Sequence, residues 1–315
     1  MNWIAANIVL IQGTVTTLLL ALSIQFPMRV GVFSLAGVGL YGIGGYGAGI
    51  AMTRFGWGTW PAAVLGLVAA GLVGYLLGLI VSRLSGLYLA MATIAFDLIV
   101  VVVAGNGGTL TGGHTGLYGA AGKFELWQIL VIALIVMVLF TLSERGSLAR
   151  KIEAVQLDPA LASSLGINVS RFRHSSFLVS GLVAGLGGAL TVLFRTTTSP
   201  EAFGFQLVVL SLTVIIVGGS RSWAGVLVGA IIFTWLPVFL AIVGEWRGVV
   251  YGLIVAVTAV YFPGGIWGAV VTLRRWWKQR GRGDLPFALP EDELDDDALS
   301  IDPLKNASTS QGRTT

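Results

Sequence analysis

The sequence contains no cysteine and only two histidines in 315 residues. The missing cysteines exclude disulfide bonds and thiol chemistry, and two histidines are too few for most metal enzymes. The chain also lacks the GxxxxGK[ST] loop that holds nucleotide phosphates, so we expect it to bind no ATP in that way and no cofactor of its own. No arrangement of nucleophile and general base stands out. We therefore predict that the chain is not an enzyme.

Charge is scarce, and long apolar runs take its place. Charged residues make up 11% of the chain, whereas an average soluble domain has about 25%. Hydrophobic residues make up 55%, glycine occurs 44 times, and several apolar runs reach the roughly 20 residues that cross a bilayer. These runs lack the two-residue alternation of membrane β-strands. The composition therefore predicts an all-α, polytopic membrane helix bundle.

The apolar runs divide into about nine expected spans, within a range of about 8–10 transmembrane helices. They cover residues 7–28, 30–52, 60–82, 86–105, 126–143, 174–194, 205–220, 222–243 and 248–270. The glycine-rich second span and the region of Gly218 and Gly219 are candidates for broken or re-entrant helices. Gly225 and Gly229 form a small-xxx-small pair, which lets helix backbones approach closely in lipid. We interpret such glycines as packing positions; the alternative is that they let helices slide.

Lysine and arginine are distributed unevenly between the two sides of these spans. With the N-terminus outside, 15 of the 19 basic residues face the cytoplasm, and five of them lie between residues 144 and 173. The positive-inside rule therefore places the C-terminus in the cytoplasm. The basic residues flank spans and do not form one patch, which argues for contact with membrane lipid and against nucleic-acid binding.

The composition changes after residue 280. We expect residues 1–280 to form the membrane domain, with a cytoplasmic loop at 144–173. Residues 281–315 carry an acidic run and a Ser/Thr/Asn-rich end, which is typical of a disordered cytoplasmic tail. Such a tail could regulate the protein or bind a partner; the alternative is a solvated tail without either role.

The loop at 144–173 contains a short helix with both ends marked. Asp158 is a good N-cap, and Pro159 stands at the first helical position, where its missing N–H costs nothing. About two turns later, Gly166 suits the left-handed position that ends a helix. A rigid capped helix at the cytoplasmic membrane face is suited to docking a cytoplasmic partner. The alternative is an ordinary loop helix between two spans.

Asp97 is the only carboxylate well inside an expected span. An ionised aspartate in mid-membrane costs about 2.5–3.5 kcal/mol on insertion scales, so we expect Asp97 to face a cavity or a polar partner. It is therefore a candidate for the translocation path. The alternative is a structural contact with another helix or subunit.

A polar turn follows the fourth span and contains Asn106, Thr111, Gly112 and Gly113. Glycine frees backbone groups there, and such groups can line a water-filled vestibule. We therefore add these residues to the candidate path, against the alternative of a flexible external loop. His114 in the same turn has no second ligand at a metal-binding spacing.

Residues 158–168, DPALASSLGIN, resemble the coupling segment in permease subunits of branched-chain amino acid ABC transporters, the LivH/LivM family. Further segments match in the same order and resemble the LivM branch of that family. They are residues 31–36, 42–46, 86–96, 110–117, 199–203, 217–219, 223–230, 251–253 and 263–266. Their order and spacing together identify the chain as a member of the family.

The resemblance implies a permease subunit of an ATP-driven importer in the bacterial plasma membrane. It implies a second, LivH-like permease, two cytoplasmic ATPases that hold ATP and Mg²⁺, and an extracytoplasmic solute-binding protein. The residues that match the coupling segment, and that would receive the movement of the ATPases, are Asp158, Pro159, Ala162, Ser163 and Gly166. The polar turn is implied to lie on or near the substrate path.

Four positions depart from the family pattern, and one of them is Arg221, which stands where the family usually has glycine and which we interpret as an interfacial anchor or lipid contact. Leu98 stands where the family usually has an acidic residue, and His114 and Thr115 replace the residues that are common at their positions. The substrate therefore stays open between branched-chain or other small amino acids and the urea, amides or aromatic acids of related permeases. Two other classes of protein also stay open: an ion-coupled secondary transporter that uses Asp97, and a membrane scaffold that acts through its tail.

Overall fold

The computed structural model describes residues 7–220, 222–240, 244, 246–261, 265, 266 and 268. These residues all belong to one compact unit, Met1–Val270. The expected tail at 281–315, the end of the ninth expected span and the basic residues after 270 lie outside the described residues.

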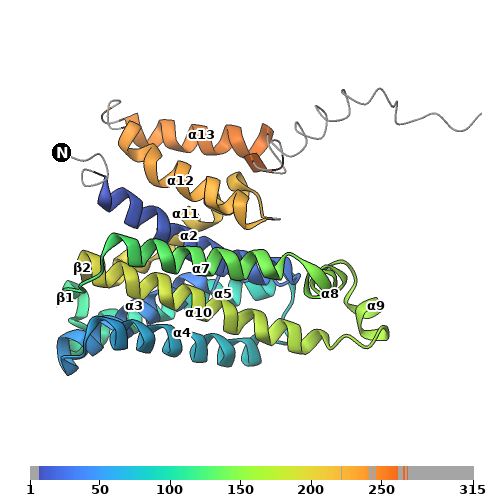
Figure 1. Ribbon diagram of the computed structural model, residues 1–315, viewed down its shortest axis with the longest axis horizontal. Helices are drawn as coiled ribbons and strands as arrows, with labels where there is room; N and C mark the ends of the chain where they lie inside the picture. The colour runs from blue at the N-terminus through green and yellow to red at the C-terminus, as the bar shows by residue number, and fades with distance from the viewer. Residues whose placement is uncertain are drawn as a thin grey trace, which may run out of the picture. The chain divides into compact units, whose positions relative to one another are not determined.

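The described chain is built almost entirely of helices (Figure 1). The long helices are α2 (Ile8–Arg29), α3 (Gly37–Phe55), α4 (Thr59–Val81), α5 (Gly86–Asn106), α7 (Leu126–Ser143), α10 (Val169–Arg195), α11 (Phe205–Gly218), α12 (Trp223–Phe239) and α13 (Arg247–Tyr261). The shorter elements are α6 (Gly108–Thr111), η1 (Gly113–Thr115), β1 (Leu117–Ala120), α8 (Gly146–Leu157), α9 (Pro159–Ser164), β2 (Thr196–Thr198) and η2 (Pro200–Phe203).

These helices confirm the all-α, multi-pass membrane architecture. Among the described residues, six segments are long and apolar enough to cross a membrane: α2, α4, α5, α7, α10 and the combined stretch Pro200–Gly218. In the same part of the chain, α12 and the Gly248–Thr258 portion of α13 are apolar but shorter. With α3 included, a helix overlaps every span that the sequence predicts.

The predicted start of the second span, at residue 30, is wrong. The N–H groups of Val30 and Gly31 bond back to the carbonyls of Pro27 and Met28, at 3.0 and 3.1 Å, and this closes the end of α2. A non-helical, mostly buried link then runs from residue 30 to residue 36, and α3 begins only at Gly37. Hydropathy could not reveal this link because its residues are themselves largely apolar.

The second suspected break is present. α11 ends at Gly218. The next residue, Gly219, has a φ of 113°, a backbone conformation that residues other than glycine rarely adopt. The chain turns there and enters α12 at Trp223.

α10 is the central helix and packs against α2, α3 and α4. Its crossings are close because glycines meet there. A Cβ on Gly44 of α3 would overlap the backbone of Gly185, and a Cβ on Gly188 would overlap the carbonyl of Tyr41. Backbone contact of this kind holds helices together in lipid, where apolar burial between helices gives little net drive. The packing interpretation of these glycines is therefore supported by the geometry.

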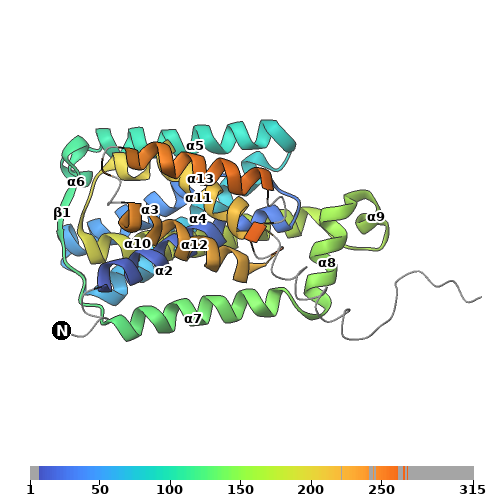
Figure 2. The same cartoon turned by 90° about the horizontal axis from the view of Figure 1, so that it is seen from above.

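The two ends of this unit differ (Figures 1 and 2). α8 and α9 lie at one end, the loop end, whereas β1 and β2 lie at the other, the hairpin end. The two strands pair antiparallel, with Leu117 opposite Thr198 and Tyr118 opposite Thr197. The sequence did not predict them, because strands of 4 and 3 residues carry too little periodicity to be recognised.

The loop at 144–173 contains α8 in addition to the expected short helix. α8 runs across the direction of α7 in Figure 2. Its buried residues Ile152 and Val155 pack in a small apolar core with Val30, beyond the end of α2, and Ala162 of α9. The loop is therefore a folded element attached to the helix bundle.

Candidate functional site

The short helix α9 has the caps that the sequence predicts. Asp158 Oδ1 accepts hydrogen bonds from the backbone N–H groups of Ala160 and Leu161, at 2.8 and 3.0 Å. Pro159 occupies the first turn, and Gly166 has a φ of 78° just after the helix. Backbone groups at both ends of α9, which has only 6 residues, are thus stabilised by caps. So short a helix is unstable by itself, and the caps help to hold it.

α9 has one attached side and one free side. Ala162 is only 1% exposed and belongs to the small core with Ile152, Val155 and Val30. Leu161 and Leu165, one turn apart, are 58% and 69% exposed, and Leu157 before the helix is 78% exposed. We call these three leucines the leucine patch. A rigid helix that is anchored through one alanine and exposes leucines is suited to insertion into an apolar groove.

Glu144, the first residue of the loop, contacts two membrane helices, α2 and α12. Its carboxylate accepts hydrogen bonds from the backbone N–H of Trp223 at 2.9 Å and from Ser222 Oγ at 3.3 Å, at the start of α12. The same carboxylate lies 3.4 Å from the guanidinium of Arg29 at the end of α2. Sequence reasoning missed this junction, since nothing in the sequence pairs residues 29, 144 and 223.

Asp97 is 3% exposed and satisfies the backbone near the start of α3. Its Oδ1 accepts a hydrogen bond from the N–H of Gly39 at 2.7 Å. One turn earlier on α5, Thr93 Oγ1 accepts from the N–H of Leu35 at 3.0 Å. The first N–H groups of a helix have no intrahelical partner, so α5 supplies the missing acceptors. This geometry matches the structural alternative for Asp97.

The polar turn after α5 is held by its own groups. Asn106 Nδ2 donates to the carbonyl of Val102 at 2.8 Å, and Thr115 Oγ1 donates to the carbonyl of Gly112 at 2.7 Å. Gly112 and Gly113 have φ values of 79° and 59°, so the turn depends on glycine. Thr111 is buried and its Oγ1 accepts from the N–H of Gly113 at 3.3 Å.

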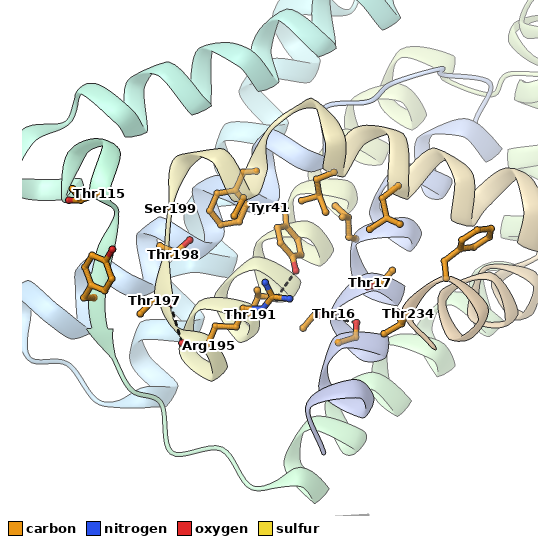
Figure 3. Close-up of a pocket in the computed structure, with 18 residues that line it drawn as sticks. Thr16, Thr17, Tyr41, Thr115, Thr191, Arg195, Thr197, Thr198, Ser199 and Thr234 are labelled. Atoms are coloured by element: carbon orange, nitrogen blue, oxygen red, sulfur yellow. Dashed lines mark hydrogen bonds between the residues drawn. The ribbon is translucent and has the colours of Figure 1, made fainter. Parts of the chain in front are cut away.

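A cavity of about 480 Å³ lies at the hairpin end (Figure 3). It is open on one side and is lined by residues of α2, α3, α10, α11 and α12, together with η1, β1, β2 and η2. Along α2 it extends from Gly13 to Leu20, about halfway down a helix of 22 residues. Hydroxyl side chains dominate its polar wall: Thr16, Thr17, Thr191, Thr197, Ser199 and Thr234.

Arg195, the last residue of α10, is the one charged side chain among the described residues that line the cavity. Figure 3 shows its guanidinium pointing into the cavity, towards Tyr41 and Thr191. The hydroxyls of Tyr41 and Thr191 form a hydrogen bond of 2.5 Å with each other. A positive charge and a shared pair of hydroxyls therefore meet inside the cavity.

The residues predicted for the translocation path do not line this cavity. Asp97 lies between α5 and α3, and Asn106, Thr111, Gly112 and Gly113 lie in the turn beside it. Thr115 and Tyr118, which follow the turn, do reach the cavity wall. Whether substrate passes the predicted residues stays a prediction. The cavity was missed because its hydroxyls come from helices far apart in sequence.

Metal binding finds no support in the described part of the chain. It contains no group of three or more histidine, aspartate or glutamate side chains that could hold an ion. The polar features of the site are therefore hydroxyls, backbone groups and the guanidinium of Arg195.

Comparison with known proteins agrees with this architecture. Residues 7–259 match the family model of the branched-chain amino acid transport system permease component. The high-affinity branched-chain amino acid transport system permease protein LivM of Escherichia coli K12 is 25% identical over 291 residues, which cover 81% of this chain and 68% of that protein. LivM of Salmonella typhimurium is 24% identical over the same lengths.

A more distant relative belongs to the other branch. The probable permease protein LivH of Methanocaldococcus jannaschii is 27% identical over 203 residues, which cover 57% of this chain and 64% of that protein. No solved structure matches. The resemblance to LivM-type permeases is thus confirmed, and this chain belongs to the family of branched-chain amino acid transport system permease components.

Proposed function

We propose that this chain is the LivM-type permease subunit of an ATP-driven ABC importer in the bacterial plasma membrane. It translocates branched-chain or other small amino acids that an extracytoplasmic binding protein delivers at the hairpin end. The loop end then faces the cytoplasm, in agreement with the positive-inside rule. Family membership supports this proposal, because the matching relatives are named as transport permeases.

The leucine patch, which comprises Leu161 of α9 and the flanking Leu157 and Leu165, is the observation that carries the proposal. Leu157, Leu161 and Leu165 are each more than half exposed, at 78%, 58% and 69%. They belong to a loop between α7 and α10 and not to a membrane span. Exposed apolar side chains on a capped, rigid helix mark a surface that binds another protein. An ATPase with an apolar groove at the cytoplasmic membrane face is the partner that fits.

The packing of α9 offers a route by which movement could reach the spans. Ala162 of α9 packs with Ile152 and Val155 of α8, and these contact Val30 in the link before α3. A Cβ on Gly31 in that link would lie 3.3 Å from Cα of Gln156, so α8 also touches the link directly. Displacement of α9 would therefore push on the start of α3, which lines the cavity through Tyr41.

The complete importer would contain further chains. We propose a second, LivH-like permease, two ATPases that bind ATP and Mg²⁺, and the solute-binding protein. A substrate or nucleotide can drive the switch between outward and inward access only through its different affinity for the two states. In the ion-coupled alternative Asp97 would carry the coupling; its Oδ1 is engaged by the backbone of Gly39, and its Oδ2 has no hydrogen-bond partner.

Co-purification tests the docking role of α9. The tagged full-length chain is purified in mild detergent and the bound chains are identified by mass spectrometry. We expect two ATPases and a second permease. Replacing Leu161 and Leu165 together by serine should remove the ATPases and leave the second permease bound, because α9 keeps its caps and its anchor Ala162.

Arg150→Gln serves as the matched control, since it alters an exposed side chain of α8 outside the leucine patch. It should retain the ATPases. Recovery of the wild-type chain without any ATPase, or equal ATPase recovery from the double serine variant, would contradict the proposal.

A further inference from the structure

The cavity at the hairpin end has no ligand assigned by the family comparisons. We propose that it binds a small molecule by its carboxylate group, with Arg195 as the residue that holds the carboxylate. The identification of this ligand as transported substrate rests on the proposed function; the binding itself does not.

Charge is the first argument. Arg195 is the one charged residue among the described lining residues, and in the described chain the only ion pair joins Arg29 to Glu144. Its guanidinium therefore points into the cavity without a carboxylate partner from this part of the protein (Figure 3). Arg195 is exposed at the end of α10, so its charge is open to water and accessible to an anionic ligand. A ligand carboxylate would pair with it in the bidentate geometry that arginine favours.

Hydrogen-bond donors converge on the same place. Tyr41 and Thr191 place two hydroxyl groups there, joined by one hydrogen bond of 2.5 Å, and hydroxyl groups can rotate to donate to a ligand. Thr234 Oγ1, which lines the same cavity from α12, has no hydrogen-bond partner. Buried polar groups are normally satisfied, and a bound ligand would account for the exception.

The remaining wall suits an apolar body. Leu20, Phe203, Leu207, Leu210 and Phe233 line the cavity from four elements. The volume of about 480 Å³ lies within the roughly 300–1,000 Å³ of small-molecule sites. The described lining contains no aspartate or glutamate to select an ammonium group. The class of ligand is therefore a small carboxylate with an apolar body, whereas urea and simple amides would leave Arg195 unpaired.

The absence of cysteine from the 315-residue chain allows a direct test. Thr197→Cys places a single thiol in the cavity wall, at an exposed residue. In membrane vesicles that contain the full chain with its natural partners, the labelling of this thiol is followed by mass spectrometry. Two methanethiosulfonate reagents of similar size are compared, one anionic and one cationic.

We expect the anionic reagent to react faster relative to the cationic one, because Arg195 attracts it. Adding Arg195→Gln should lower the ratio of the two rates by about tenfold, as a nearby unit charge does at a partly solvated site. Arg195→Lys should preserve most of the ratio. Lys123→Gln, which removes an exposed charge at the same end but outside the cavity, should leave it unchanged.

Protection of the thiol from labelling by added ligands identifies the chemical class of molecule that the cavity binds. Leucine and benzoate should slow the labelling of Thr197→Cys, whereas leucinamide and benzamide should not, and Arg195→Gln should abolish the difference. Ala121→Cys, exposed and outside the cavity, should show no protection. Equal protection by the amides, or no protection by either carboxylate, would overturn the proposal. Because labelling needs neither ATP nor the ATPases, failure of the importer proposal would leave these results interpretable.

Discussion

Asp97 in α5 accepts a hydrogen bond from the backbone N–H of Gly39, 2.7 Å away, in the first turn of α3. Together with Thr93, which accepts from Leu35 at 3.0 Å, it supplies acceptors where α3 starts inside the bundle. Asp97 is only 3% exposed, so bulk water has little access to these N–H groups, and a single carboxylate oxygen stabilises the start of a glycine-rich helix.

Asp97→Ala should destabilise the protein by about 1–3 kcal/mol, because the N–H of Gly39 would be buried without an acceptor. Asp97→Asn keeps an oxygen at the same place and should cost much less. The apparent melting temperature of the purified chain in detergent measures both. Equal melting temperatures for the alanine and wild-type proteins would show that the hydrogen bond does not stabilise α3.

Gly44→Ala should disrupt the crossing of α3 and α10. A Cβ at Gly44 would overlap the backbone of Gly185, whereas the nearest atom to a Cβ at Gly47, Gly66 Cα, is 3.5 Å away. We expect Gly44→Ala to cost about 1–3 kcal/mol through overpacking, or to prevent assembly. Gly47→Ala in the same helix is the control and should be neutral or slightly stabilising. Size-exclusion profiles after heating provide the comparison.

Glu144→Ala should weaken the junction between the loop and α12 more than Glu144→Gln does. Glutamine retains an acceptor for the N–H of Trp223, 2.9 Å from Glu144 in the wild type, but loses the charge that faces Arg29. A double-mutant cycle with Arg29→Ala should give an interaction energy of about 0.5–3 kcal/mol. An interaction energy near zero would mean that Arg29 and Glu144 act independently.

Gly166→Ala should loosen α9 without disturbing the spans. Gly166 has a φ of 78°, and a Cβ there would meet nothing within 4 Å, so only the backbone conformation opposes the change. The cost is about 1–2 kcal/mol for a left-handed alanine. Asparagine tolerates this conformation better, so Gly166→Asn is the control. We expect the alanine variant to hydrolyse more ATP per molecule transported, which paired hydrolysis and uptake assays measure.

Local signals in the sequence predicted much of the fold. Hydropathy located a helix for each expected span, and capping chemistry placed α9 between Asp158 and Gly166. Both signals come from residues that are close together in the sequence. Such residues keep the same local interactions in the folded protein, so the predictions made from them agree with the structure.

Long-range features were not predicted. The link at 30–36 is apolar like the helices that flank it, so its break depends on the acceptors Thr93 and Asp97 from another helix. The cavity likewise assembles Thr16, Thr191 and Arg195 from positions up to 179 residues apart in a 315-residue sequence. Such sites arise from packing and leave no periodic trace.

ATP-dependent uptake is the most direct test of the central claim. The purified complex is reconstituted in liposomes with its binding protein outside and ATP inside, and the uptake of labelled leucine, isoleucine and valine is measured. We predict uptake that requires both ATP and the binding protein and that persists when ionophores abolish all ion gradients. Uptake that an ion gradient drives without ATP would contradict the account and identify a secondary transporter.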